Sequence, residues 1–316
     1  MSIKFIKYIF FKLREKNIFN TGLAIANINS NKKKIHSLKD IEFSSFSQNG
    51  EDGILDWLIS TIKLNERLKF IEFGCGDFME CNTRFLLKKR NWKGLLVDSE
   101  KNNTDTILSD SMFWRYDVRV LNKKLDKNNI NQILIDNNHI KEIGVLSLDI
   151  DGNDYWVINE LKFRPAIIVC EYNGIFGDKY QLTVPYDKDF MRTRKHYSNL
   201  YFGASILALI ENLKKKNYFF VGSDSSGINA FFVEKKYFKN ISNKIENILI
   251  YAPAHRESRD ANNKLTYTDW PNQIELIKET EVYDIKKNIN ILIKNIIKDI
   301  YSETFKTKKF IVYKKN

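Results

Sequence analysis

Two glycines separated by a single residue follow a short apolar run in the segment 69–77, which reads Lys-Phe-Ile-Glu-Phe-Gly-Cys-Gly-Asp. Gly74 and Gly76 carry no Cβ, so the backbone can bend sharply there and a ligand can approach it closely. Glu72 precedes the glycines, and Asp98 ends a second apolar run 22 residues after Gly76. An acid at about this distance can hold both hydroxyls of a ribose. The spacing therefore predicts a turn that binds a nucleoside.

The segment lacks the motifs that bind dinucleotides and phosphate chains, which limits the nucleosides that it could bind. It has no third glycine of the dinucleotide fingerprint and no Gly-Lys-Ser/Thr of a phosphate-binding loop. A ligand without a long phosphate chain fits better, and S-adenosylmethionine is the candidate. A lone Gly-x-Gly is weak evidence, because glycines are common in turns. The order of a helix-like stretch at 82–89, then Gly94, then Asp98 strengthens the prediction.

A second polar group stands in the segment 147–156, Ser-Leu-Asp-Ile-Asp-Gly-Asn-Asp-Tyr-Trp, directly after a nearly continuous apolar run. Ligands bind at the carboxyl ends of parallel strands, and we expect Asp149 beside the reactive end of the cofactor. Clustered oxygen ligands of this kind could hold Mg²⁺ or another divalent cation. As an alternative, Asp151 and Asp154 form a turn and a helix cap, and the sequence leaves these two roles about equally favoured.

The next apolar run ends in Cys-Glu-Tyr-Asn, so Glu171 and Asn173 are expected in the same crevice. A carboxylate there could take a proton from a substrate hydroxyl or complete a metal site. The alternative is that both side chains hydrogen-bond to the following loop. We take Asp149, then Glu171 and Asp151, as the catalytic candidates. The candidate metal ligands are Asp149, Asp151 and Asn173.

These groups need a scaffold of alternating strands and helices. The expected strands are 69–74, 94–98, 112–118, 143–150, 166–171, 218–222 and 228–233. The alternation predicts an α/β fold with a doubly wound, mostly parallel sheet, and the hairpin that joins the last two strands implies one antiparallel strand. This is the strand pattern of the Rossmann-like methyltransferase fold. We expect that domain at 45–237, with helical extensions at 1–44 and 238–316.

The N-terminal segment 1–20 is both basic and apolar. Ile3, Ile6, Phe10 and Leu13 recur at helical spacing, while Lys7 and Lys12 interrupt the apolar run too early for a signal peptide or a membrane span. A helix that packs on the core is favoured. An amphipathic helix that lies on an anionic inner membrane surface is the alternative.

The net charge of +12 raises the possibility of a nucleic-acid partner. The lysines are dispersed along the chain instead of gathered in one motif, so a solvated surface explains them better. His255, Arg256 and Arg259 could grip an anionic substrate, although a surface helix turn is the favoured reading. The three cysteines form no Cys-x-x-Cys and no even disulfide set, which favours a reducing compartment and a cytoplasmic location.

The motifs together resemble the FkbM-type methyltransferases. The matching pieces are Ser-Gln-Asn-Gly-Glu-Asp-Gly-Ile-Leu from Ser47, Glu-Phe-Gly-Cys-Gly-Asp from Glu72, Asn-Thr-Arg-Phe-Leu from Asn82, Trp-Lys-Gly-Leu-Leu-Val-Asp from Trp92, Leu-Asp-Ile-Asp-Gly-Asn-Asp-Tyr-Trp-Val from Leu148, Glu-Tyr-Asn from Glu171, Tyr-Phe-Gly-Ala-Ser from Tyr201 and Asn-Ala-Phe-Phe-Val from Asn229. The resemblance implies an S-adenosylmethionine-dependent class I enzyme that methylates hydroxyls of sugars or surface-glycan precursors. It further implies that Glu72, Gly74, Gly76 and Asp98 bind the cofactor, with Asp117 near its adenine. A nucleic-acid methyltransferase and a non-catalytic binding protein of the same fold are the alternatives.

Overall fold

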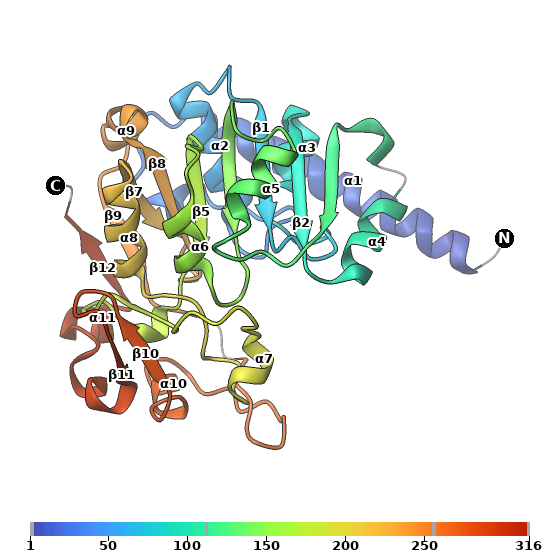
Figure 1. Ribbon diagram of the computed structural model, residues 1–316. Coiled ribbons are helices and arrows are strands. Elements are labelled where there is room, and N and C mark those ends of the chain that lie inside the picture. Colours follow the sequence, from blue (N-terminus) through green and yellow to red (C-terminus); the bar gives the residue numbers. More distant parts are fainter. Residues whose placement is uncertain (1–2, 111–112, 255–256, 315–316) are drawn as a thin grey trace.

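The computed structural model describes residues 3–110, 113–254 and 257–314, with side chains from residue 12 onward. One sheet has the strand order β3-β2-β1-β4-β5-β8-β7 (Figure 1). Its strands are β1 (Lys69–Phe73), β2 (Lys93–Asp98), β3 (Val118–Asn122), β4 (Ile143–Leu148), β5 (Ile167–Glu171), β7 (Tyr218–Ser223) and β8 (Asn229–Glu234). Strand β8 runs antiparallel to both of its neighbours, and the other pairs are parallel. The predicted fold class, a Rossmann-like methyltransferase fold with one antiparallel strand, is confirmed.

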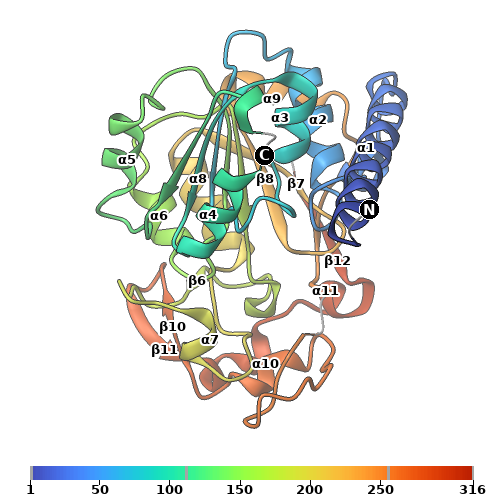
Figure 2. The same ribbon diagram turned by 90° about the vertical axis from the view of Figure 1, so that its right-hand side faces the viewer.

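Helices cover both faces of this sheet. They are α2 (Glu51–Ile62), α3 (Arg84–Arg90), α4 (Lys101–Ser109), α5 (Ile130–Asp136), α6 (Asp154–Glu160), α8 (Ile206–Lys215) and α9 (Lys235–Ser242). Figure 2 shows α2, α3 and α9 on one side of the sheet and α5, α6 and α8 on the other. Every residue of β4 is buried, with Val145 packed in one hydrophobic layer and Leu146 in the other. Burial on both faces explains why this strand is almost continuously apolar.

The long N-terminal helix α1 (Ile3–Ser30) lies against the domain through its described side chains. Nη2 of Arg84 on α3 lies 2.7 Å from Oε1 of Glu15, and the ring of Phe19 meets the edge of Phe85. Packing on the core, the favoured alternative, therefore describes the helix from residue 12 onward. Leu13 is 53% exposed, and a membrane contact stays a prediction. Within the described residues, none of the helices combines the length and the apolar character needed to cross a bilayer.

The C-terminal segment differs from the helix-rich extension that the sequence predicts. It contains β9 (Ile248–Tyr251), α10 (Gln273–Leu276), β10 (Glu281–Asp284), β11 (Ile289–Leu292), α11 (Glu303–Lys308) and β12 (Phe310–Tyr313). Strand β12 pairs with β9, while β10 pairs with β11 and with β6 (Leu182–Thr183). Strands of four residues are too short to show a periodicity. Elements α10, β10, β11 and α7 (Arg192–Lys195) lie below the carboxyl ends of the parallel strands in Figure 1, whereas β9 lies beside β7.

The third strand also begins later than predicted. The expected strand 112–118 overlaps β3 only at Val118, because residues 113–115 form a 3₁₀ turn. Met112 lies outside the described residues. The aromatic pair Phe113-Trp114 resembles a strand in composition, although Trp114 is 78% exposed. This shift of one element has a consequence for the site, since it reverses the edge of the sheet on which Asp117 lies.

Candidate active site at the carboxyl edge of the sheet

The glycine turn lies directly after β1, and backbone hydrogen bonds connect the end of β1 and this turn to the ends of β2 and β4. The amide of Gly74 donates to the carbonyl of Val97 on β2 (2.9 Å), and the amide of Asp149 after β4 donates to the carbonyl of Phe73 (3.1 Å). Gly74 has φ +76° and Gly76 has φ +55°, which an L-residue with a side chain adopts only at a cost. The sequence therefore places glycine where the backbone requires it, between the predicted cofactor strand and the predicted catalytic strand.

Asp98 ends β2 beside this turn, as predicted. Its Oδ2 accepts from the amide of Gly76 (2.8 Å), and its Oδ1 accepts from the amide of Glu100 (2.8 Å) and from Nδ2 of Asn103 (3.1 Å). The side chain is largely buried yet lines the open cleft described below. These bonds fix the carboxylate of Asp98 between the glycine turn and the start of α4, and its contact with a ribose stays a prediction.

Glu72 faces a different task from the one predicted for it. Its carboxylate accepts from the amides of Asn82 (2.7 Å) and Thr83 (3.1 Å) and from the hydroxyl of Thr83. These bonds fix the segment that starts α3. Burial raises the pKa of Glu72 to about 7. Glu72 does not line the cleft, so we expect it to support a cofactor site through the turn and not by contact.

The expectation that Asp117 lies near an adenine does not fit the structure. Asp117 precedes β3, and its carbonyl accepts from the amide of Gly94 at the start of β2 (2.9 Å). Parallel strands begin at one edge of a sheet and end at the other, so Asp117 lies at the edge opposite Asp98. Its side chain is 71% exposed and pairs with Lys93. Residues after β3, Lys123 to Leu125, line the cleft instead.

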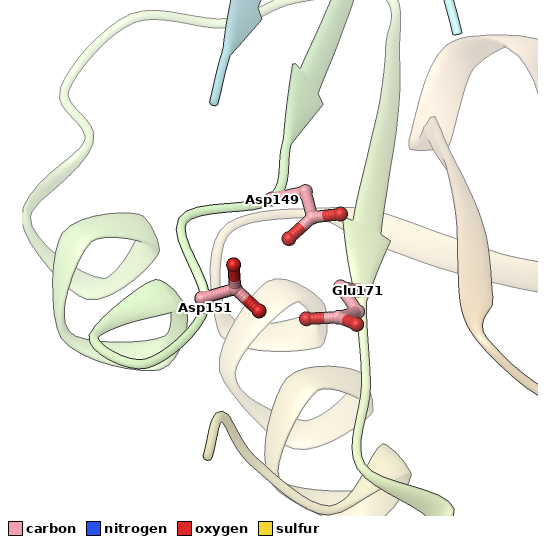
Figure 3. A group of neighbouring side chains, drawn as sticks. All are labelled: Asp149, Asp151 and Glu171. Carbon is pink, nitrogen blue, oxygen red and sulfur yellow. The ribbon is translucent and has the colours of Figure 1, made fainter. Parts of the chain in front are cut away.

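Asp149, Asp151 and Glu171 come together at the ends of β4 and β5. One carboxylate oxygen from each lies within 4.8 Å of the others, and Figure 3 shows the three side chains pointing toward a common centre. We call these three residues the carboxylate cluster. Enclosure by protein, together with the neighbouring negative charges of Asp151 and Asp154, raises the pKa of Asp149 to about 8. Burial and the charge of Asp149 raise the pKa of Glu171 well above its usual range. A group with a pKa near working pH is suited to general base catalysis.

The turn between Asp149 and α6 decides between the two readings of its acids. Asp154 is fully buried and accepts from the amides of Ile150 and Gly152, each at 3.0 Å. It therefore holds the turn before α6, but it does not cap the helix as predicted, because the N-cap position is that of Asn153. Asp151 has φ +56° and a side chain 58% exposed, and it faces the cluster. Aspartate tolerates this left-handed conformation in turns, so the backbone of Asp151 fits the turn role while its side chain takes part in the cluster.

Asn173, a predicted metal ligand, is fully engaged elsewhere. Its Nδ2 donates to the carbonyls of Leu200 (2.9 Å) and Phe202 (3.0 Å), and its Oδ1 accepts from the amide of Ile175 (3.1 Å). The side chain is 1% exposed. Hydrogen bonding to the following loop, the alternative role, is what the structure contains, and Glu171 takes the third position in the cluster.

Arg192 is a member of the site that sequence reasoning missed. Its Nη1 lies 2.7 Å from Oδ1 of Asp151 and 3.9 Å from Oε1 of Glu171. It stands 41 residues from Asp151, in a four-residue helix without periodicity. The sequence offers only the general tendency of arginine to pair with carboxylates, which does not single out Arg192.

An open cleft of about 830 Å³ connects the parts of the site. Gly74, Gly76, Asp98, Asp149 and Asp151 line it along the sheet edge. Residues of two loops also line it, among them Asn199, Glu257 and Arg259, and we call this loop-lined part the far end. His255 and Arg256, which were grouped with Arg259, lie outside the described residues. The cleft has room for a nucleoside at the glycine turn and for a second molecule beyond the carboxylate cluster.

One backbone hydrogen bond joins the two loops at the far end, and another closes the second loop on itself. The amide of Arg259 donates to the carbonyl of Ser198 (3.3 Å), and the amide of Thr266 donates to the carbonyl of Ser258 (2.8 Å). Arg259 also pairs with Leu265, so this stretch is a bridged turn and not the predicted helix turn. Four apolar or aromatic side chains of these loops are exposed: Met191 (38%), Tyr197 (48%), Leu265 (40%) and Tyr267 (62%). We call these four residues the rim.

Comparisons with known proteins find similarity only among solved structures. No family model matches the chain, and no curated protein matches it. Among solved structures, a SAM-dependent methyltransferase from Aquifex aeolicus is similar, with 10% identity, a TM-score of 0.32 and coverage of 62% of this chain and 94% of that one. An S-adenosylmethionine-dependent methyltransferase from Clostridium acetobutylicum ATCC 824 has 13% identity, a TM-score of 0.34 and coverage of 57% and 90%. At such low scores we base the fold assignment on the strand order alone.

Proposed function

We propose that the protein is an S-adenosylmethionine-dependent O-methyltransferase that acts on a hydroxyl of a sugar or a surface-glycan precursor. The observation that carries this proposal is the single cleft that joins the glycine turn and Asp98 to the carboxylate cluster. The motifs that resemble FkbM-type methyltransferases support the same activity. The carboxyl edge of a doubly wound sheet is also where such folds bind their ligands.

The bound cofactor would supply an electrophilic methyl group. The protein must then place an acceptor oxygen in line with that methyl and remove the proton from the oxygen. Asp149 is the first candidate for the base, since it lies next to the glycine turn and lines the cleft. The cofactor would supply the methyl group to the acceptor oxygen, and Asp149 would accept the proton that the acceptor hydroxyl loses. The charge of Asp151 raises the pKa of Asp149, and the side chain of Glu171 acts in the opposite direction.

The far end of the cleft supports a carbohydrate acceptor. Asn199, Glu257 and Arg259 offer planar polar groups there that can donate to or accept from sugar hydroxyls. The tyrosines of the rim add exposed aromatic faces, on which the apolar face of a sugar ring can pack. Among the described residues, five acidic and four basic ones line the cleft (Asp98, Glu100, Asp149, Asp151 and Glu257; Lys123, Lys124, Arg192 and Arg259). The balance of these described charges favours a neutral acceptor over a polyanion.

Calorimetry with S-adenosylmethionine and its demethylated product tests the cofactor, and transfer of a labelled methyl group into a glycan extract tests the reaction. Cofactor affinity without transfer would favour the non-catalytic alternative. A gel shift with RNA and DNA at physiological salt tests the nucleic-acid alternative, because only a nucleic-acid methyltransferase is expected to retain binding there.

A further inference from the structure

Three carboxylates that meet in a partly buried site need a compensating positive charge or shared protons. The sequence alone suggests a divalent cation for this purpose, and the carboxylate cluster has the oxygen ligands that such an ion prefers. The structure offers another source of charge within the same group. This source is the guanidinium of Arg192, and its position relative to Asp151 and Glu171 decides whether a divalent cation can bind there as well.

Arg192 lies between the acids. Its Nη1 is 2.7 Å from Oδ1 of Asp151 and 3.9 Å from Oε1 of Glu171. A divalent ion bound by these two side chains would sit about 2.0–2.6 Å from their oxygens, in the same gap. Two positive charges that close also repel each other. The guanidinium and a metal ion therefore compete for one position.

The guanidinium is held in place by contacts outside the cluster. Its Nε donates to the carbonyl of Asn199 (2.7 Å), and its Cζ lies 3.7 Å from the centre of the Phe202 ring. An arginine on an aromatic face with one fixed hydrogen bond has lost most of its freedom before it meets the acids. Since α7 has only four residues, these contacts, and not helix packing, fix the side chain.

We propose that Arg192 is the built-in cation of the carboxylate cluster: it pairs with Asp151 and Glu171, takes the place of a divalent ion and leaves Asp149 facing the cleft as the base. The catalytic purpose of Arg192 rests on the proposed methyl transfer. Its pairing with Asp151 and Glu171 does not depend on that proposal. Arg192 is then a positioning residue that acts through Asp151 and Glu171.

The test is a titration with Mn²⁺ alone, followed by electron paramagnetic resonance of the free ion, without cofactor or acceptor. We expect the wild-type protein to show no saturable site that depends on Asp151. The Arg192→Gln variant should gain such a site. Removal of one positive charge at this distance should tighten Mn²⁺ binding by about tenfold or more. The double variant with Asp151→Asn should lose the site again.

Arg194→Gln is the matched control, since Arg194 lies on the same short helix and is exposed; it should behave as the wild type. Wild-type binding of Mn²⁺ that Asp151→Asn removes would overturn the proposal, and so would Arg192→Gln without a new site. If Arg192→Gln does not fold, the comparison of the wild type with Asp151→Asn still decides. None of these titrations involves methyl transfer, so their failure and that of the proposed function are distinguishable.

Discussion

Gly74 packs against the backbone carbonyl of Asp149 so closely that a Cβ on Gly74 would lie 1.6 Å from that oxygen. The contact joins the predicted cofactor turn to the predicted catalytic strand through main-chain atoms, which cannot move aside as a flexible side chain can. The residues directly before these two, Phe73 on β1 and Leu148 on β4, are also paired in the sheet. The position of Asp149 relative to a cofactor is therefore set by the sheet itself.

Gly74→Ala should consequently be far more harmful than Gly76→Ala. Both glycines have positive φ, but a Cβ on Gly76 would meet no described atom within 4 Å. We expect Gly76→Ala to lower the free energy of unfolding by about 1 kcal/mol, the cost of the backbone conformation. Gly74→Ala should lower it by about 3 kcal/mol or more, because the sheet must also shift. Urea unfolding of the two variants measures the difference, and equal losses would contradict the close contact.

Asp98→Ala should lose most of the affinity for S-adenosylmethionine. The carboxylate is the candidate acceptor for the ribose hydroxyls, and each such bond lost should cost about 1–3 kcal/mol. Asp117→Ala is the control, since Asp117 lies at the opposite edge of the sheet in an exposed pair with Lys93. Calorimetry on both variants makes the comparison. Equal affinity of Asp98→Ala and the wild type would reject this cofactor site.

Local patterns were enough to predict the parts of the site that lie next to strand ends. Gly74, Asp98, Asp149 and Glu171 each follow a strongly apolar run, and the edge of a parallel sheet brings such positions together. The fold class follows from the same alternation and is confirmed. The glycine turn needs positive φ at both glycines, which the sequence signals directly.

The errors come from positions where the local pattern is ambiguous or absent. An aromatic pair before β3 resembles a strand, so the strand was placed too early and Asp117 was assigned to the wrong edge. Asn173 follows a strand end but is engaged by the backbone of residues 200 and 202, a contact no local pattern reveals. Arg192 reaches the cluster from a loop that is ordered by its tertiary contacts. Tertiary placement of loop residues cannot be read from periodicity.

Methyl transfer should persist in excess chelator if Arg192 supplies the positive charge. Arg192 lowers the raised pKa of Asp149, on which burial and the charges of Asp151 and Asp154 act in the other direction. We therefore expect the rate of the wild type to rise with pH toward a plateau above about 8, and that of Arg192→Gln to rise only at higher pH. The pH profiles of both proteins in chelator test this. Loss of wild-type activity that Mg²⁺ restores would favour the metal instead.

The free energy of unfolding should fall as pH rises, whereas the reaction rate should rise. A carboxyl whose folded-state pKa is raised stabilises the fold fully below its unfolded pKa, about 4, and this contribution is lost as pH rises through the folded value. For Asp149 that value is about 8. Asp149→Asn removes the titration. Because Asp149 is only half-buried, we expect the difference in unfolding free energy between pH about 5 and about 8.5 to shrink by roughly 1 kcal/mol. Asp117→Asn should keep the wild-type dependence, and an unchanged dependence in Asp149→Asn would contradict the raised pKa.

Substitution in the rim should affect the acceptor and leave the cofactor untouched. Tyr267 is 62% exposed and follows Thr266, whose amide bonds to the loop that carries Arg259 and Glu257 at the cleft. Loss of an aromatic face from a sugar should cost about 1–2 kcal/mol, or roughly fivefold to thirtyfold in affinity. We therefore expect Tyr267→Ala to raise KM for the acceptor found in the glycan extract by that factor, with kcat and the affinity for S-adenosylmethionine unchanged.

Tyr237→Ala is the control, because Tyr237 lies on α9 and outside the two loops that carry the rim. Its kinetic constants should equal those of the wild type. The double variant Tyr197→Ala/Tyr267→Ala should raise KM further if both tyrosines contact the acceptor, since their loops are joined through Ser198 and Arg259. An unchanged KM in the double variant would show that the acceptor does not reach the rim.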